Sequence, residues 1–191
     1  MDFHPMLLDV PEQFQSARLE MRAVGAGDGQ AHFPAVQESI QELRMHLAHL
    51  PWVKEGPSLA NSERYCRTQR SNFIQRQNLV FFMYLKSDQT LIGSVGLHRI
   101  EWEVPRVEIG YWCRTSAQGK GYVAEAVHAI TDYAFTQLAA KRVEIRADDL
   151  NERSWKVAEN CGFHLEGILR QFDRDAVSQE LRDLRIYSKI A

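Results

Sequence analysis

The sequence lacks any long hydrophobic run. No apolar segment approaches the ~20 residues that a membrane-spanning helix needs. Residues 1–14 include Asp2, Asp9 and Glu12, which interrupt the apolar core that a signal peptide requires. Both absences lead us to expect a soluble, intracellular protein.

Cysteine is also scarce. The chain has three cysteines, Cys66, Cys113 and Cys161, which are far apart and show no Cys-x-x-Cys spacing. This pattern supports neither a disulfide framework nor a zinc site, so we expect no metal. A reducing cytoplasm is the compartment that fits these cysteines best.

The chain carries little excess charge. Its formal net charge is −2 and its pI is about 6.4, whereas domains that bind nucleic acid or membranes by bulk attraction usually have a clear positive excess. We therefore expect neither partner. With 191 residues, of which 45% are hydrophobic, the chain is long enough for one domain with a real core and short for two. The prediction is a single domain over residues 1–191.

Residue periodicity predicts a chain that mixes strands and helices. Alternating or β-branched and aromatic runs predict strands over residues 17–24, 79–85, 91–99, 106–113, 142–147, 163–173 and 181–190. Apolar residues at three- and four-residue spacing predict helices over 33–50 (interrupted near Ser39), 58–77 (capped by Ser58 or Ser62), 122–138 and 151–160. Residues 1–15 are expected to be a loosely ordered lead-in and 51–57 a loop. The predicted fold class is α+β, a mixed, mostly antiparallel sheet flanked by helices.

The segment from Ser116 to Tyr122 contains two glycines, Gly119 and Gly121, between an apolar strand and a helix. Such a turn brings main-chain N–H groups and a helix dipole to one point, which is how proteins hold a phosphate. Taken alone, a Gly-x-Gly pair is more often an ordinary tight turn. Rossmann and P-loop sites are excluded, because neither Gly-x-Gly-x-x-Gly nor Gly-Lys-Ser/Thr occurs here.

The residues around this turn form an ordered series. It comprises Val107-Glu108-Ile109-Gly110-Tyr111-Trp112, Gln118-Gly119-Lys120-Gly121-Tyr122, Glu125-Ala126, Asn151-Glu152-Arg153-Ser154, Asn160-Cys161-Gly162-Phe163 and Glu166-Gly167. In this series the chain resembles the GNAT superfamily of acetyl-CoA-dependent N-acetyltransferases, and within it the RimJ/RimL-type branch that acetylates protein N-termini. The resemblance extends from Ser16 to Tyr187 and implies a GNAT-like fold with acetyl-CoA as cosubstrate.

The resemblance also implies where acetyl-CoA binds. The amides of residues 118–123 would hold the pyrophosphate, and glycine at two positions would allow its close approach. The end of the preceding strand would pair its main chain with the pantetheine arm, and an N–H there would face the thioester oxygen. The implied cofactor-binding residues are Trp112, Cys113, Arg114, Gln118, Gly119, Lys120, Gly121, Tyr122, Val123 and Asn151.

The reaction that the resemblance implies requires two proton transfers, one of them to the leaving sulfur. Many relatives place a tyrosine seven residues after the asparagine for this purpose, and Ala158 occupies that position here. Ser154 is the hydroxyl expected to replace it. A thiol with a pKa of ~8.5 leaves unprotonated at pH 7 at a cost of about 2 kcal/mol, so a weak donor suffices.

A carboxylate is expected to take the proton of the incoming amine. Glu108, beside the acetyl group, is the first candidate, directly or through water, although a structural pair with an arginine explains it equally well. Asp173 is the second candidate, and Glu101 and Glu103 would form acidic walls for a cationic substrate. An α-amine with a pKa of ~8 is about one-tenth neutral at pH 7, whereas a lysine at ~10.4 is almost fully charged. An α-amine therefore demands less of a base.

Other reactive or aromatic residues are expected to be structural or to line the substrate groove. His98 lies among apolar neighbours on a strand, and no histidine is placed to activate Cys113. The aromatic residues expected in the core are Tyr111, Trp112 and Phe163. Those that the family layout would place along the substrate groove are Trp52, Tyr65 and Trp102.

The function implied by the resemblance is acetyl transfer to a primary amine, first of all the N-terminal α-amine of a protein such as a ribosomal protein. Two alternatives stay open. One is an acetyltransferase for a small amine, such as a polyamine, an amino acid or an aminoglycoside. The other, motivated by Ala158, is a non-catalytic acyl-CoA-binding regulatory module. A homodimer is compatible with the sequence, which has no readable code for the acceptor.

Overall fold

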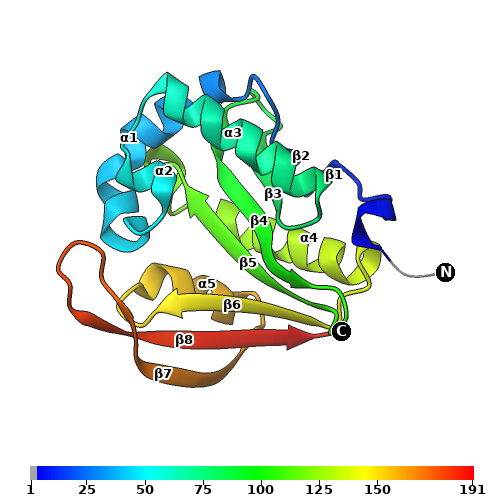
Figure 1. Cartoon of the computed structure of the whole chain (residues 1–191), viewed down its shortest axis with the longest axis vertical. Helices are drawn as coiled ribbons and strands as arrows, with labels where there is room; N and C mark the ends of the chain where they lie inside the picture. The colour runs from blue at the N-terminus through cyan, green and yellow to red at the C-terminus, as the bar shows by residue number, and fades with distance from the viewer. Residues whose placement is uncertain (1–3) are drawn as a thin grey trace.

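The computed structural model describes residues 4–191, so the first three residues of the expected lead-in lie outside it. The strands form one eight-stranded sheet in the order β1-β2-β3-β4-β5-β6-β8-β7 (Figure 1). In chain order the elements are η1 (Pro5–Leu7), β1 (Gln13–Gln15), β2 (Leu19–Ala23), α1 (Gly29–Leu47), α2 (Pro51–Lys54), α3 (Leu59–Ile74), β3 (Leu79–Leu85), β4 (Leu91–Glu101), β5 (Arg106–Cys113), η2 (Thr115–Ala117), α4 (Tyr122–Gln137), β6 (Arg142–Asp148), α5 (Glu152–Asn160), β7 (His164–Arg174) and β8 (Leu181–Ile190).

Antiparallel neighbours dominate the sheet. Strands β1 to β5 pair antiparallel in sequence order, and β8 pairs antiparallel with both β6 and β7. Strands β5 and β6 are parallel, and α4 makes the crossover between them, because a short turn cannot join parallel strands. This topology confirms the predicted α+β class with a mixed, mostly antiparallel sheet.

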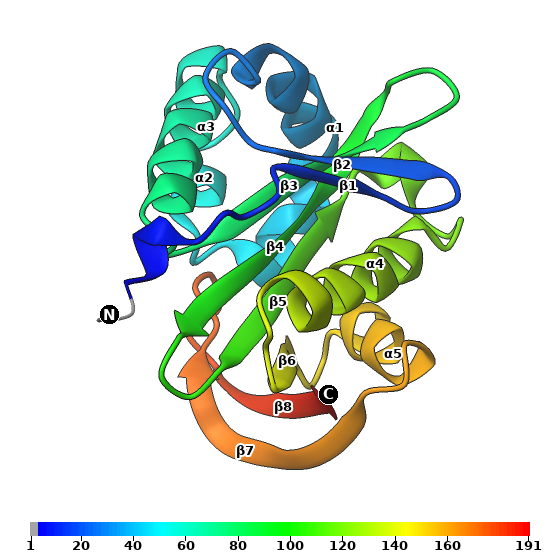
Figure 2. The same cartoon turned by 90° about the vertical axis from the view of Figure 1, so that its right-hand side faces the viewer.

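Side-chain alternation divides the core between the two faces of the sheet. Along β3, the core that includes α4 takes Leu79, Phe81 and Met83, and the core that includes α1, α2 and α3 takes Val80, Phe82 and Tyr84. Figure 2 shows α4 and α5 on the opposite side of the sheet from α1, α2 and α3. None of the helices within residues 4–191 combines the length and apolar character required to cross a membrane.

The first half of the chain departs from its prediction in three places. Helix α1 runs unbroken through Ser39, so the predicted interruption is wrong. The hydroxyl of Ser39 is buried and accepts a hydrogen bond from the N–H of Thr115 at 3.0 Å, so it does not compete for the main chain of its own helix. Residues 51–57 contain the short helix α2, and the lead-in contributes the edge strand β1. The N-cap of α3 is Ser58, whose side chain accepts from Asn61.

Candidate active site

The sheet opens between β5 and β6. These strands pair only over residues 106–109 of β5, whereas β5 stays paired with β4 as far as Cys113. Figure 1 shows the two strands diverging. Successive residues of a strand direct their main-chain groups to alternate sides, and the N–H of Arg114 is bonded to Ile92 of β4. The main-chain groups of Tyr111 and Cys113 therefore face the opening, whereas those of Trp112 and Arg114 face β4.

The turn after β5 leaves a series of N–H groups free. Gly119 and Gly121 have φ values of 73° and 77°, and α4 begins at Tyr122. Within residues 4–191, the N–H groups of residues 119–124 donate no hydrogen bond. Some of these N–H groups belong to the first turn of α4, where free N–H groups and the helix dipole favour the binding of an anion.

Gly119 combines a left-handed backbone with open surroundings. A Cβ atom there would meet no protein atom within 4 Å, so the protein itself does not crowd this position. The left-handed conformation is the part that favours glycine. The position beside Gly119 is open and bordered by free N–H groups, so no protein atom blocks the approach of a ligand to the main chain there.

Two carboxylates of helix α1, those of Glu38 and Glu42, accept hydrogen bonds from the turn and brace it. Glu38 accepts hydrogen bonds from the N–H of Ser116 at 2.8 Å and from the guanidinium of Arg114 at 2.5 Å. Burial acts to raise the pKa of Glu38, but these donors outweigh it and the pKa is lowered. Glu42 accepts from the side-chain amide of Gln118. Sequence reasoning missed this brace, because its partners are 76 to 78 residues apart and no local pattern connects them.

Glu125 ties the start of α4 to the β1–β2 turn. One of its oxygens accepts from the hydroxyl of Ser16 and the N–H of Arg18, and the other accepts from Arg18 Nε at 2.6 Å. The guanidinium of Arg18 lies 4.5 Å from the centre of the Tyr122 ring. Glu125 is therefore occupied as an anchor, and it places a cation beside the glycine turn.

Helix α5 carries the serine expected to meet the thiol. Asn151 caps this helix, because its Oδ1 accepts from the N–H of Ser154 at 3.1 Å. The Nδ2 of Asn151 has no acceptor within the described part of the chain and is free to bind a ligand. The hydroxyl of Ser154 lies 3.0 Å from that of Tyr111 on β5. One turn further along α5, Ala158 is fully buried and offers no hydroxyl.

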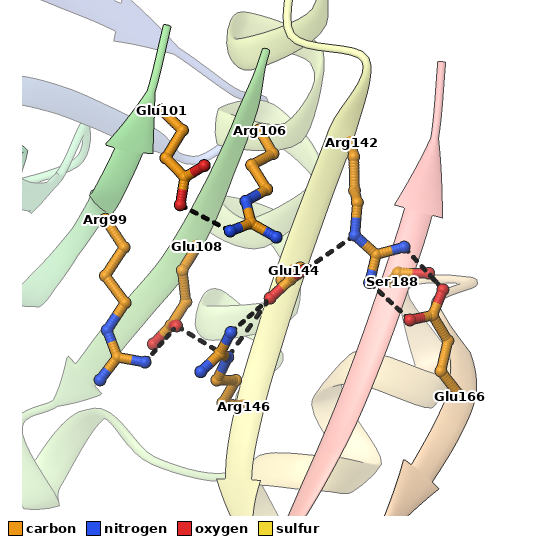
Figure 3. A network of polar contacts seen from close by, with 9 residues as sticks. All are labelled: Arg99, Glu101, Arg106, Glu108, Arg142, Glu144, Arg146, Glu166 and Ser188. Atoms are coloured by element: carbon orange, nitrogen blue, oxygen red, sulfur yellow. Dashed lines mark hydrogen bonds and ion pairs between the residues drawn. The ribbon is translucent and has the colours of Figure 1, made fainter. Parts of the chain in front are cut away.

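Glu108 belongs to a ladder of alternating charges on one face of the sheet. Its carboxylate lies 3.3 Å from Arg99 and 3.1 Å from Arg146. Burial raises the pKa of Glu108, although both arginines oppose the shift. The structural pairing with arginine is thus present, together with a raised pKa that suits a base. Figure 3 shows the rest of the ladder crossing the sheet through Arg146, Glu144, Arg142 and Glu166.

The other acidic candidates lie apart from Glu108. Asp173 is exposed on the edge strand β7, opposite Arg182 of β8, with β8 and β6 between it and β5. At ~4.8 Å per strand, β7 and β5 are about 14 Å apart along the sheet. Glu101 forms an ion pair with Arg106 at 2.6 Å, and Glu103 is exposed. The structure therefore does not join these carboxylates into one cluster.

Several aromatic residues gather around His32. Its ring stacks against those of Tyr65 and Phe82 at centroid distances of 4.9 and 5.2 Å, and the rings of Trp52 and Trp112 lie at 5.7 Å. Burial lowers the pKa of His32 to about 4, so the ring is neutral at pH 7. Trp112 is buried as expected, and Tyr65, expected along the groove, is stacked in this packed cluster.

Trp102 and His98 lie at the other end of β5 from the glycine turn. Trp102 follows β4 in the hairpin before β5, and its Nε1 lies 3.4 Å from the carbonyl oxygen of Arg76. Trp102 is thus distant along the sheet from the opening, which is at the end of β5, and its place along the substrate groove stays a prediction. The Nδ1 of His98 lies 3.2 Å from Asn78 Oδ1, as a structural histidine would.

Comparison with known proteins identifies a family. Residues 18–164 match the model of the family described as acetyltransferase (GNAT) domain. The ribosomal-protein-serine acetyltransferase of Escherichia coli (strain K12) is 32% identical over 145 residues, which are 73% of this chain and 79% of that protein. Two further relatives are "Uncharacterized N-acetyltransferase p20" of Bacillus licheniformis, 35% identical over 49% of this chain and 53% of that protein, and "Probable N-acetyltransferase YjcK" of Bacillus subtilis (strain 168), 39% identical over 48% and 51%. The chain thus spans about half the length of these two relatives.

Solved structures share the fold. The microcin C7 self-immunity acetyltransferase MccE, solved with acetyl-CoA and AMP, has a TM-score of 0.85 at 21% identity, covering 95% of this chain and 98% of that one. The ribosomal L7/L12 α-N-protein acetyltransferase RimL, solved with coenzyme A, has a TM-score of 0.82 at 21% identity, covering 95% and 97%.

Proposed function

Because the chain belongs to the GNAT acetyltransferase family, we propose that it transfers the acetyl group of acetyl-CoA to a primary amine. The proposed acceptor is the N-terminal α-amine of a protein, with a ribosomal protein as the first candidate. The observation that carries this proposal is the match to the Escherichia coli ribosomal-protein-serine acetyltransferase over 73% of the chain. The opening in the sheet and the glycine turn supply the matching chemistry.

The residues present fit coenzyme A. The free N–H groups of residues 119–124 would hold the pyrophosphate. Arg18 and Lys120 would add positive charge beside it, since both cations lie at the same turn. The main-chain groups of Tyr111 and Cys113, with the free Nδ2 of Asn151, would hydrogen-bond the amides of the pantetheine arm, as an added strand would.

The chemistry is direct transfer. The nitrogen lone pair of a neutral amine attacks the thioester carbon, the N–C bond forms, the C–S bond breaks, and the proton lost by nitrogen balances the one that the sulfur gains. The chain would assist at three points. A main-chain N–H at the end of β5 would stabilise the carbonyl oxygen. The hydroxyl of Ser154 would donate a hydrogen bond to the sulfur. Glu108, whose pKa is raised by burial, would accept the proton from nitrogen directly or through water, with Asp173 as second choice.

An acceptor panel tests the function. We expect thiol release from acetyl-CoA in the presence of peptides with free N-termini and little release with the same peptides after N-terminal blocking, because about one-tenth of an α-amine is neutral at pH 7. Acetylation of polyamines, amino acids or aminoglycosides but of no peptide would contradict the proposed acceptor. Tight binding of coenzyme A without thiol release from any amine would favour the regulatory module that Ala158 motivates.

We further propose that the protein works in the cytoplasm, since all three cysteines are free thiols. A homodimer is the proposed assembly. The β7–β8 hairpin supports it, because β7 is a long edge strand and the hairpin exposes several apolar side chains, namely Leu165, Ile168, Leu169, Phe172, Val177 and Leu181. Sedimentation of the protein and of a Phe172→Glu variant tests this, and a parent that sediments as a monomer at all concentrations would contradict it.

A further inference from the structure

Two hydroxyl groups meet where β5 faces α5. The Tyr111 hydroxyl donates to the carbonyl oxygen of Ser154 at 2.9 Å and lies 3.0 Å from the Oγ of the same residue. The two residues are 43 positions apart in the chain, so the sheet and α5 together create this contact. Burial raises the pKa of Tyr111, so its phenol is protonated and can donate at pH 7.

The Ser154 hydroxyl can be bonded in two ways. When the Tyr111 hydroxyl donates to the Ser154 carbonyl, the hydroxyl oxygen of Tyr111 can accept a hydrogen bond from the Ser154 hydroxyl. When Tyr111 instead donates to Oγ, the Ser154 proton becomes free to point elsewhere, because each hydroxyl has one proton and two acceptor positions. Both arrangements need only a rotation of the two O–H bonds, since the Tyr111 oxygen is within 3.0 Å of both acceptors.

We propose that Tyr111 is a positioning residue that directs the proton of Ser154 at the departing sulfur of coenzyme A. This inference rests on the proposed acetyl transfer. As the C–S bond breaks, negative charge grows on sulfur and Ser154 donates to it. Tyr111 rotates its donor from the Ser154 carbonyl to Oγ, which strengthens the Ser154 donor, because hydrogen bonds in a chain polarise one another. No proton leaves either hydroxyl, and the sulfur takes its proton from the amine through base or water.

The substitution Tyr111→Phe tests the role, because it keeps the ring in the core and removes only the hydroxyl. Tyr133→Phe is the matched control. The Tyr133 hydroxyl also donates to a main-chain carbonyl, that of Pro11 at 2.7 Å, but it lies on α4 against the N-terminal segment. Both variants lose one part-buried hydrogen bond to a main-chain carbonyl, so a purely structural role predicts the same behaviour for both.

The decisive readout is the pKa of the bound coenzyme A thiol, followed by thiolate absorbance during a pH titration. We expect Tyr111→Phe to raise this pKa by about half to one unit, because the thiolate loses part of its donor. Tyr133→Phe should match the parent. In a Ser154→Ala background, Tyr111→Phe should add nothing further. A Tyr111→Phe titration that matches the parent, or an equal shift in the absence of Ser154, would overturn the proposal.

Turnover provides the second readout. Tyr111→Phe should lower kcat roughly tenfold and leave the KM for acetyl-CoA nearly unchanged, because the lost interaction forms mainly in the transition state. The two proposals fail separately. If the parent acetylates no amine but Tyr111→Phe still raises the pKa of the bound thiol, the acetyl transfer is refuted and the Tyr111–Ser154 pair is retained. If the parent acetylates peptides but Tyr111→Phe leaves the pKa of the bound thiol unchanged, the role of Tyr111 is refuted and the acetyl transfer is retained.

Discussion

Gly119 offers a way to separate cofactor binding from folding. Replacement by alanine adds one Cβ atom in a position with φ of 73° and no protein atom within 4 Å. The cost to folding is therefore the left-handed backbone alone, about 1 kcal/mol. For a chain of this length, that cost lowers Tm by about 2 to 4 °C.

The same Cβ enters the space where the free N–H groups of residues 119–124 converge. If the coenzyme A pyrophosphate lies against these groups, the methyl group must displace it or lengthen its hydrogen bonds. Loss of about 1.4 kcal/mol of binding free energy weakens the affinity tenfold, so we expect at least a tenfold rise in Kd. The drop in coenzyme A affinity of Gly119→Ala should thus be larger than its small drop in folding stability can explain.

Isothermal titration calorimetry with coenzyme A, paired with thermal unfolding, measures both effects. Gly27→Ala is the matched control, since Gly27 has φ of 96°, has no protein atom within 4 Å of the place a Cβ would take, and lies before α1, away from the glycine turn. It should lose similar stability and bind coenzyme A like the parent. A Gly119→Ala protein that binds coenzyme A as tightly as Gly27→Ala would refute the assignment of the pyrophosphate to this turn.

Three further perturbations test the chemistry and the packing. Ser154→Ala should lower turnover about tenfold while calorimetry shows nearly unchanged coenzyme A binding, and an unchanged rate would remove Ser154 from the mechanism. Glu108→Gln should abolish the low-pH limb of the rate profile, since the parent loses its base as the pH falls through the raised pKa of Glu108; a retained limb would point to Asp173 or water. Urea unfolding should show stability falling from pH 6.5 toward pH 4 by up to ~3 kcal/mol on account of His32, because the unfolded chain keeps the ordinary pKa of 6.5 and binds more protons there than the folded state, whose His32 pKa is about 4. His32→Phe should reduce that slope, and an identical slope would contradict the linkage.

Local chemistry made much of the fold predictable. The strand over residues 79–85 was predictable from its run of β-branched and aromatic residues, and the helix beginning at residue 122 from its three- to four-residue apolar spacing, because both are properties of neighbouring residues. Ser39 shows the limit of such reasoning. A serine in a helix is ambiguous on its own, and its partner, the N–H of Thr115, is 76 residues away.

The sequence by itself determined the order of the main strands and helices, the α+β class, the glycine turn and the family, because each depends on residue types at characteristic spacings, whereas β1 and α2 were not predicted. Only the tertiary structure decided which groups face one another. It set the point where β5 separates from β6, braced the turn with Glu38 and Glu42, and brought Tyr111 to Ser154. Contacts between residues 40 to 80 positions apart depend on how the sheet is ordered and how the helices pack on it, and no local spacing encodes that.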